Sequence, residues 1–154
     1  MTKLIEITGD LFTTEAPSLS QGVNVDGAMD SGIAPVFKRL YPEMYTEYRA
    51  LCLAGELLPG GTHSWHGPKT VYNAASQDRP GRNARLDWLE SSLLIAFDDA
   101  DDRGYDRIAM PLIGCGVGGL DWADVRPVII RLAETHLADA EVWILPSNPL
   151  SVMR

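Results

Sequence analysis

An apolar run in the last third of the sequence leads into a glycine-rich loop and then into a helical pattern. Residues 107–113, RIAMPLI, have the pattern of a buried strand, and the following GCGVGG places four glycines within six positions. A helical pattern covers 125–137, with Pro127 near its start. Asp121 is expected to cap the turn that precedes this helix. A strand, a glycine loop and a helix in this order predict one unit of an α/β fold.

The same alternation runs through the rest of the chain of 154 residues, which has the length of a single domain. Strand patterns cover 3–8, 20–25 and 141–145, and helical patterns cover 32–40 and 42–55. A hairpin with HGPK as its turn is expected within 56–76. The clearest helix carries its apolar face on Leu86, Leu89, Leu93, Ala96 and Phe97. We therefore predict an α/β three-layer sandwich with a mixed, mostly parallel central sheet flanked by helices.

Charge and composition exclude several classes of protein. The net charge of -8 and the pI of about 4.7 repel polyphosphate, so non-specific duplex binding is not expected and any nucleic acid contact must be local. No apolar stretch approaches the roughly 20 residues that span a bilayer, and the start MTKLIEITGD lacks a signal-peptide pattern. We expect a cytoplasmic protein without membrane contact, in which Cys52 and Cys115 are reduced.

Three loops that follow strands have the chemistry of a ligand site. In α/β folds ligands bind at the carboxyl ends of the strands. The bare amides of GCGVGG can wrap an anion, although a purely structural tight turn is the alternative. A second small-residue loop, DGAMDSGIA at 26–34, also leads into a helix, and two such loops beside one crevice suit a diphosphate. Asp10 follows the first strand, where it either accepts from an exocyclic amine such as adenine N6 or only forms the turn.

Several segments in the right order make the chain resemble a known family. ITGDLF, GVNVDGAMDSGIAPVFK, VYNAASQ and MPLIGCGVGGLDWADVRPVI together resemble the macrodomains, which bind ADP-ribose, across essentially the whole chain. The similarity is greatest to the branch of the human terminal ADP-ribose protein glycohydrolase and of the antitoxin macrodomains that remove ADP-ribose from thymidine in DNA. The resemblance implies a single macrodomain over 1–154 that needs no cofactor or metal.

The resemblance also implies which residues contact the ligand. Asp10, followed by Leu11, reads the adenine, and Pro146, with the residues up to Asn148, flanks it. The diphosphate and the distal ribose lie on the loop that contains Gly27, Met29, Ser31, Gly32 and Ile33. The phosphates are covered from the other side by Gly114, Cys115, Gly116, Val117 and Gly118. Cys115 is either a nucleophile or, with no histidine near it in sequence, only a small side chain that fits a tight loop.

Two catalytic side chains of the related branch are replaced in this chain. Gln77 stands at the position of the lysine credited with attack on the anomeric carbon, and Gly118 replaces an aspartate of the glycine loop. Glutamine cannot form a Schiff base or supply a proton of suitable pKa, so a lysyl adduct is excluded. Hydrolysis by a water that the substrate's own phosphate assists remains open, with Gln77 orienting the water or the leaving group.

The remaining candidates for chemistry are polar residues near these loops. Asp26, Asp30 or Asp78 is a candidate base, and the alternative for each is a loop residue that bonds its own backbone. Asn24 is expected beside the distal ribose. His63 and His66 lack a third metal ligand, and the four aspartates of DDADDRG at 98–104 read as a solvated helix end.

Arg79, Arg82 and Arg85 form a basic loop, which is either solvated or in contact with a phosphate of modified DNA or with an acidic modified protein. The sequence thus predicts an ADP-ribosyl hydrolase that acts on ADP-ribosylated acidic side chains of proteins or on thymidine of DNA. A non-catalytic reader of ADP-ribose and an ADP-ribose 1''-phosphate phosphatase are the alternatives. The oligomeric state is not predicted.

Overall fold

The computed structural model describes residues 3–146, and strands and helices alternate along them. The strands are β1 (Leu4–Thr8), β2 (Ser18–Val23), β3 (Thr62–His66), β4 (Thr70–Ala75), β5 (Arg107–Met110) and β6 (Asp139–Ile144). The helices are the short 3-10 helix η1 (Leu11–Thr13) and the α-helices α1 (Ala34–Leu40), α2 (Pro42–Leu53), α3 (Leu86–Asp102) and α4 (Trp122–Glu134). No helix in this part of the chain is both long and apolar enough to cross a membrane.

All strands belong to one sheet in the order β1-β6-β5-β2-β4-β3. The pairs β1–β6, β6–β5, β5–β2 and β2–β4 are parallel, and β3 pairs with β4 in the antiparallel direction. The antiparallel pair is the hairpin predicted around HGPK. The sheet is therefore mixed and mostly parallel, as the alternation of strands and helices predicts.

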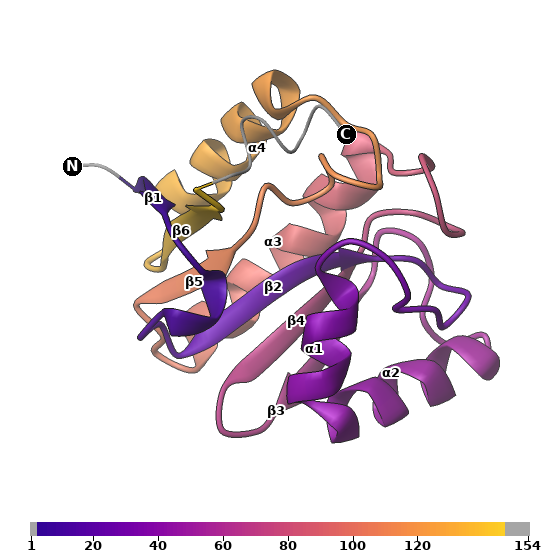
Figure 1. Cartoon of the computed structure of the whole chain (residues 1–154). Helices are drawn as coiled ribbons and strands as arrows, with labels where there is room; N and C mark the ends of the chain where they lie inside the picture. The colour runs from indigo at the N-terminus through magenta and orange to yellow at the C-terminus, as the bar shows by residue number, and fades with distance from the viewer. Residues whose placement is uncertain (1–2, 147–154) are drawn as a thin grey trace.

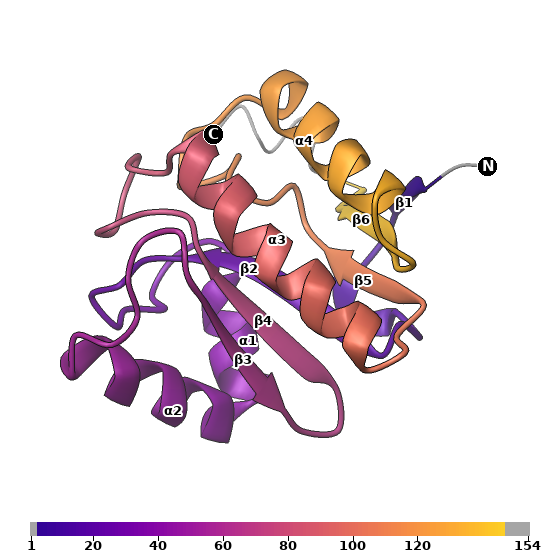
Figure 2. The same cartoon turned by 180° about the vertical axis from the view of Figure 1, so that it is seen from behind.

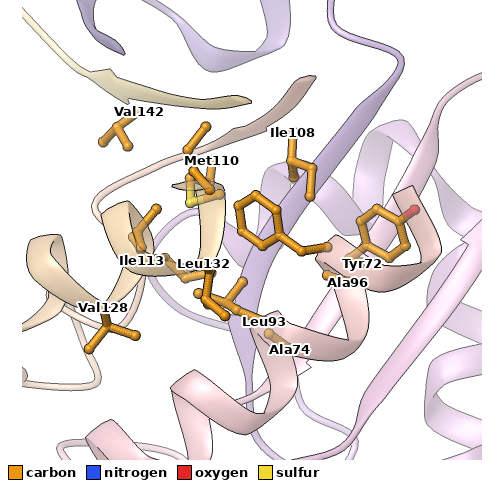
Figure 3. Packing of buried hydrophobic residues seen from close by; sticks show 14 of the residues in the cluster. Tyr72, Ala74, Leu93, Ala96, Ile108, Met110, Ile113, Val128, Leu132 and Val142 are labelled. Atoms are coloured by element: carbon orange, nitrogen blue, oxygen red, sulfur yellow. The ribbon is translucent and has the colours of Figure 1, made fainter. Parts of the chain in front are cut away.

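Helices cover both faces of the sheet. Helices α1 and α2 lie on the face turned to the viewer in Figure 1, and α3 and α4 lie on the opposite face, seen from behind in Figure 2. One apolar core joins Phe37 and Tyr48 to the first face, and the other, drawn in Figure 3, joins Leu93 and Leu132 to strand residues such as Met110. The predicted three-layer sandwich is confirmed.

Several boundaries differ from the predicted ones by two or three residues. Strand β5 ends at Met110 instead of Ile113, and α4 ends at Glu134 instead of Leu137. Helix α4 begins at Trp122, not at Val125, because the side chain of Asp121 accepts a hydrogen bond from the Ala123 amide at 3.0 Å and starts the helix there. Pro127 therefore lies inside the helix, on its exposed side, where water can satisfy the carbonyl that loses its partner. Strand β2 spans Ser18–Val23 instead of 20–25, because its pairing with β4 runs from Ser18 opposite Thr70 to Val23 opposite Ala75.

The aspartates at the end of α3 are not simply a solvated helix end. Asp99 accepts a hydrogen bond from the Tyr72 hydroxyl at 2.6 Å, and Asp101 accepts from the backbone amide of Leu137 at 3.0 Å. Asp98 lies 2.7 Å from the ring of a histidine in the connection between α4 and β6. These carboxylates fasten the end of α3 to its neighbours, which offsets their unfavourable position in the helix dipole.

That histidine, His136, is held in a setting that favours its charged form. Its Nδ1 lies 2.7 Å from the Leu132 carbonyl and its Nε2 lies 2.7 Å from Asp98 Oδ1, so both nitrogens face acceptors and both must donate. Burial, the largest single influence, lowers the pKa of His136, but the bonds to Asp98 and Leu132 and the nearby Asp101 charge outweigh it. The net result is a pKa above the usual 6.5.

We expect the bond between Asp98 and His136 to stabilise the fold only while the histidine is protonated. A folded-state pKa raised above 6.5 adds stability below that pH and loses it as the pH rises through the folded value. Asp98→Asn should lower the free energy of unfolding by about 0.5–1 kcal/mol at pH 5.5 and by much less at pH 9. Urea titrations at both pH values measure this. Exposed Asp102→Asn is the control, and an equal loss at both pH values for Asp98→Asn would contradict the prediction.

Candidate functional site

The site lies where two neighbouring parallel strands diverge. Strands β2 and β5 pair only at Ser18 with Ile108 and at Leu19 with Ala109. The chain leaves β2 toward α1 on one face of the sheet, and it leaves β5 toward α4 on the other face (Figures 1 and 2). Connections that leave neighbouring strands on opposite faces create a crevice beyond their carboxyl ends, which is the usual place for a ligand in such a fold.

A cleft of about 890 Å³ occupies this crevice. Its walls come from 9–12 after β1, from the end of β6, and from parts of 22–39, 76–81 and 111–122. The volume suits a ligand of several rings, because small-molecule sites typically enclose about 300–1,000 Å³.

The structure brings most of the predicted ligand-binding residues to the walls of this cleft. Those that line it are Asp10, Leu11, Ser31, Gly32, Ile33, Gly114, Cys115, Gly116, Val117 and Gly118. Gly27, Met29 and Pro146 are not among its lining residues. Met29 is buried in the core, where its sulfur accepts from the side-chain amide of Gln21 at 3.7 Å. The predicted position of Asn148 lies outside the described residues.

The two glycine-bearing loops approach each other across the cleft. Gly32 has the left-handed φ of +65°, and a Cβ added there would lie 3.3 Å from the side chain of Val117 on the opposite loop. A Cβ added at Gly116 would meet no atom within 4 Å. The backbone at Gly116 is therefore bare and faces open space, which leaves its surroundings available to a ligand. Gly114, in contrast, has a φ of +77° and packs against Leu120, so it serves the turn itself.

At one end of the cleft, Asp10 lies beside aromatic side chains. Asp10 Oδ1 accepts from the Phe12 amide at 3.0 Å and caps η1, while its Oδ2 accepts no hydrogen bond within residues 3–146. Phe12 and Trp143 line the same end. Side chains alternate along β6, so Val142 packs on the α4 side of the sheet and Trp143 packs on the other side. Trp143 was not among the predicted site residues, although an aromatic residue near the end of a predicted strand was an available signal.

Gln77 lines the cleft and is held by its own loop. Its Nε2 donates to the carbonyls of Arg79 at 2.6 Å and Gly81 at 3.0 Å, so both amide protons are used. Its Oε1 accepts no hydrogen bond from the described part of the chain. A Cβ added at Gly118 would lie 3.1 Å from this oxygen and 2.8 Å from the Cβ of Ala84. An aspartate at 118 would therefore require Gln77 or Ala84 to move. Gln77 and Gly118, the two positions that differ from the related branch, are thus in contact with each other.

Among the other catalytic candidates, Asn24 and Asp30 line the cleft, whereas Asp26 and Asp78 do not. Asn24 is occupied with its loop, since its Nδ2 donates to the Ala28 carbonyl at 3.0 Å and its Oδ1 accepts from the Asp26 amide at 3.0 Å. Asp30 is exposed, and its contact with Lys38 is long, 3.8 Å. Asp78 lies on the far side of its loop, paired with an arginine at 3.0 Å.

Two smaller side chains complete the inner wall. Burial raises the pKa of the Cys115 thiol to about 12, and the charge of Asp121 acts in the same direction, so the thiol stays neutral and is not a nucleophile. Ser76 was missed by the sequence analysis. Its Oγ is buried and has no hydrogen-bond partner within residues 3–146. A polar residue directly after a strand as buried as β4 was the available signal.

Known proteins are similar to this chain in sequence and in fold. The macro domain family model matches residues 18–129. A DNA ADP-ribosyl glycohydrolase of Mycobacterium tuberculosis is 33% identical over 146 residues, which cover 92% of this chain and 41% of that protein. A human ADP-ribose glycohydrolase is 24% identical over 147 residues, which cover 93% of this chain and 92% of the human protein.

Among solved structures, the macrodomain of Mycobacterium tuberculosis DarG superimposes with a TM-score of 0.81 at 30% identity, covering 95% of this chain and 99% of that one. The chain spans 41% of the length of the mycobacterial glycohydrolase, so the likeness concerns one part of that protein. The family model nevertheless covers most of this chain, including β2, β5 and both loops that face the cleft. The chain belongs to the macro domain family.

Proposed function

We propose that the cleft binds ADP-ribose and that the protein hydrolyses the bond between ADP-ribose and thymidine in DNA. The observation that carries the proposal is the pair of loops that face each other over the cleft, with the backbone at Gly116 open to it. Support for the reaction comes from the relatives, which are named DNA ADP-ribosyl glycohydrolase and ADP-ribose glycohydrolase. ADP-ribosylated acidic side chains of proteins are the second substrate class.

The cleft offers a place for each part of the ligand. The adenine fits beside Phe12 and Trp143, where the free Oδ2 of Asp10 can accept from its exocyclic amine. The diphosphate fits between 31–33 and 114–118, where backbone amides and the absence of side chains favour an anion. Arg39 also lines the cleft and has no ion-pair partner among the described residues, so it adds positive charge in an acidic protein.

The distal ribose then lies toward Gln77 and Ser76, and the proposed reaction takes place there. A water oxygen attacks the anomeric carbon, and the bond from this carbon to the target breaks, with its electron pair leaving on the target atom. The proton of the water passes to a phosphate oxygen of the substrate and from there to the released target. Gln77 Oε1 accepts a hydrogen bond from this water and orients it, because the two bonds of Nε2 fix the side chain. Asp30 lines the cleft and is the carboxylate we propose as an alternative proton acceptor.

The test is a single-turnover release of ADP-ribose from two substrates, a thymidine-linked oligonucleotide and a glutamate-linked protein. We expect release from the oligonucleotide at a rate well above that in buffer. Binding of ADP-ribose without release from either substrate would identify a non-catalytic reader, for which the replaced lysine and aspartate are the supporting observation. Release from the protein substrate alone would move the proposal to acidic side chains.

We expect Asp10→Ala to weaken ADP-ribose binding by about 1–3 kcal/mol, because one charged hydrogen bond is lost. Titration calorimetry measures the effect. Alanine also removes the cap on the Phe12 amide, so Asp10→Asn is the matched variant: its Oδ1 keeps the cap, but its Nδ2 donates where the adenine amine also donates. Both variants should lose affinity. Wild-type affinity in Asp10→Asn would mean that Asp10 only shapes the turn.

A further inference from the structure

A second, smaller hollow lies on the other side of the loop that carries Gln77. It encloses about 340 Å³ and is lined by Asp78, Arg79, Arg82, Asn83, Ala84, Arg85 and Trp88. Pro80 and Gly81 of the same loop line the large cleft, so the loop is a wall shared by the two. Three arginines thus meet beside the cleft of a chain whose net charge is -8.

Arg82 lies on the glycine loop. A Cβ added at Gly119 would be 3.1 Å from the Cζ of Arg82 and 3.2 Å from its Nε, so the guanidinium rests on bare backbone there. Arg82 is exposed, and no carboxylate pairs with it among residues 3–146. Its charge is therefore free to meet an anion at the rim of the cleft.

Arg85 and Trp88 both line the hollow and contact each other. The Arg85 guanidinium lies 4.6 Å from the centre of the Trp88 ring, a cation–π contact. Arg85 also stands at the N-cap of α3, where it makes no capping bond and where a positive charge opposes the helix dipole. Arg85 makes a bidentate pair with Asp87, from Nε at 3.1 Å and from Nη2 at 3.0 Å, and Arg79 pairs with Asp78 at 3.0 Å. Both pairs are exposed, so a phosphate can share these guanidinium groups with the carboxylates.

We infer that Arg79, Arg82, Arg85 and Trp88, here called the arginine–tryptophan surface, bind the single-stranded DNA next to the modified thymidine. The arginines contact backbone phosphates, and a neighbouring base stacks on the Arg85 guanidinium, which the Trp88 ring supports. Arginines around an aromatic ring are typical of proteins that bind single-stranded nucleic acid. An acidic peptide would pair with the arginines but would not stack on the ring. The inference rests on the proposed function, because it gives a binding site to the nucleotides on either side of the thymidine whose ADP-ribose lies in the cleft.

The inference is tested with two substrates, ADP-ribosyl-thymidine within a single-stranded 12-mer and the same modified nucleoside without flanking nucleotides. Arg82→Ala should lower kcat/KM for the 12-mer about tenfold, the effect of one charge-assisted contact, and leave the nucleoside rate unchanged. Trp88→Ala should have an effect of similar size, and Trp88→Phe should retain most of the rate because the stack remains. Arg103→Ala, which removes the same charge at the far end of α3, is the control.

The salt dependence gives an independent readout. The slope of log kcat/KM against log salt for the 12-mer should fall by about 0.7 in Arg82→Ala, one phosphate contact on a single strand. Suppose that wild type releases ADP-ribose from both substrates, but that Arg82→Ala and Trp88→Ala slow release from the 12-mer no more than release from the nucleoside. The arginine–tryptophan surface is then not a DNA site, and the proposed function stands. If these variants instead slow release from the glutamate-linked protein, the surface serves a protein target. No release from any substrate overturns the proposed function itself.

Discussion

Gly116→Glu is expected to abolish ADP-ribose binding while the melting temperature stays within about 2 °C of wild type. The new side chain meets no atom within 4 Å at its Cβ, and Gly116 does not have a left-handed φ, so the fold gains no strain. Substitutions of this kind change stability by about 0.5 kcal/mol, which is roughly 2 °C for a domain of this size. The carboxylate, however, would lie where we place the diphosphate, and like charges in a partly buried cleft repel by several kcal/mol.

Calorimetry and thermal melting of the same samples test both halves of this expectation. Gly116→Gln is the matched variant, because it has the bulk of glutamate without the charge, and it should retain more affinity than Gly116→Glu. Normal binding by Gly116→Glu would place the phosphates away from this loop. A large fall in melting temperature would instead mean that the loop needs glycine at 116 for its own structure.

The sequence predicted the layers well because their signals are local. The apolar periodicity of residues 86–97 predicted α3. The change from the apolar run RIAMPLI to glycines and then to Asp121 predicted a βα unit, and neither signal depends on how the rest of the chain folds. The boundaries of β2 were less clear. Its buried Ser18, Ser20 and Gln21 interrupt the apolar pattern, and their partners lie on other strands, for example Asn73 at 3.0 Å from the Gln21 amide.

The cleft was harder to predict, because the direction of a side chain in a loop depends on contacts that are distant in sequence. Asn24 and the Tyr48 hydroxyl, which donates to the Asn24 carbonyl at 2.7 Å, fix the path of the loop at 24–28. That path buries Met29 and leaves Asp26 outside the cleft. The sequence also cannot show that the loop after β4 has two sides, with Gln77 toward the cleft and Asp78 toward the arginines.

Gln77→Ala should separate binding from chemistry. We expect it to lower the single-turnover rate on the thymidine-linked oligonucleotide by about 10- to 1000-fold and to leave ADP-ribose affinity nearly unchanged, as for a group that orients reactants. The side chain also anchors the carbonyls of Arg79 and Gly81, so Gln77→Lys is the informative second variant. Lysine can still donate to these carbonyls, but it offers no oxygen to a water.

Gln77→Lys is therefore expected to be as slow as Gln77→Ala and to form no trapped adduct with the substrate. The aspartate that accompanies lysine in the related branch is absent, and the space at Gly118 is filled by Ala84 and by residue 77 itself. Borohydride trapping followed by mass spectrometry detects such an adduct. A fast Gln77→Lys variant with a trapped adduct would show that the cleft supports lysine chemistry without that aspartate. Equal rates for wild type and Gln77→Ala would remove Gln77 from the mechanism, and Asp30→Asn would then be the next variant to measure.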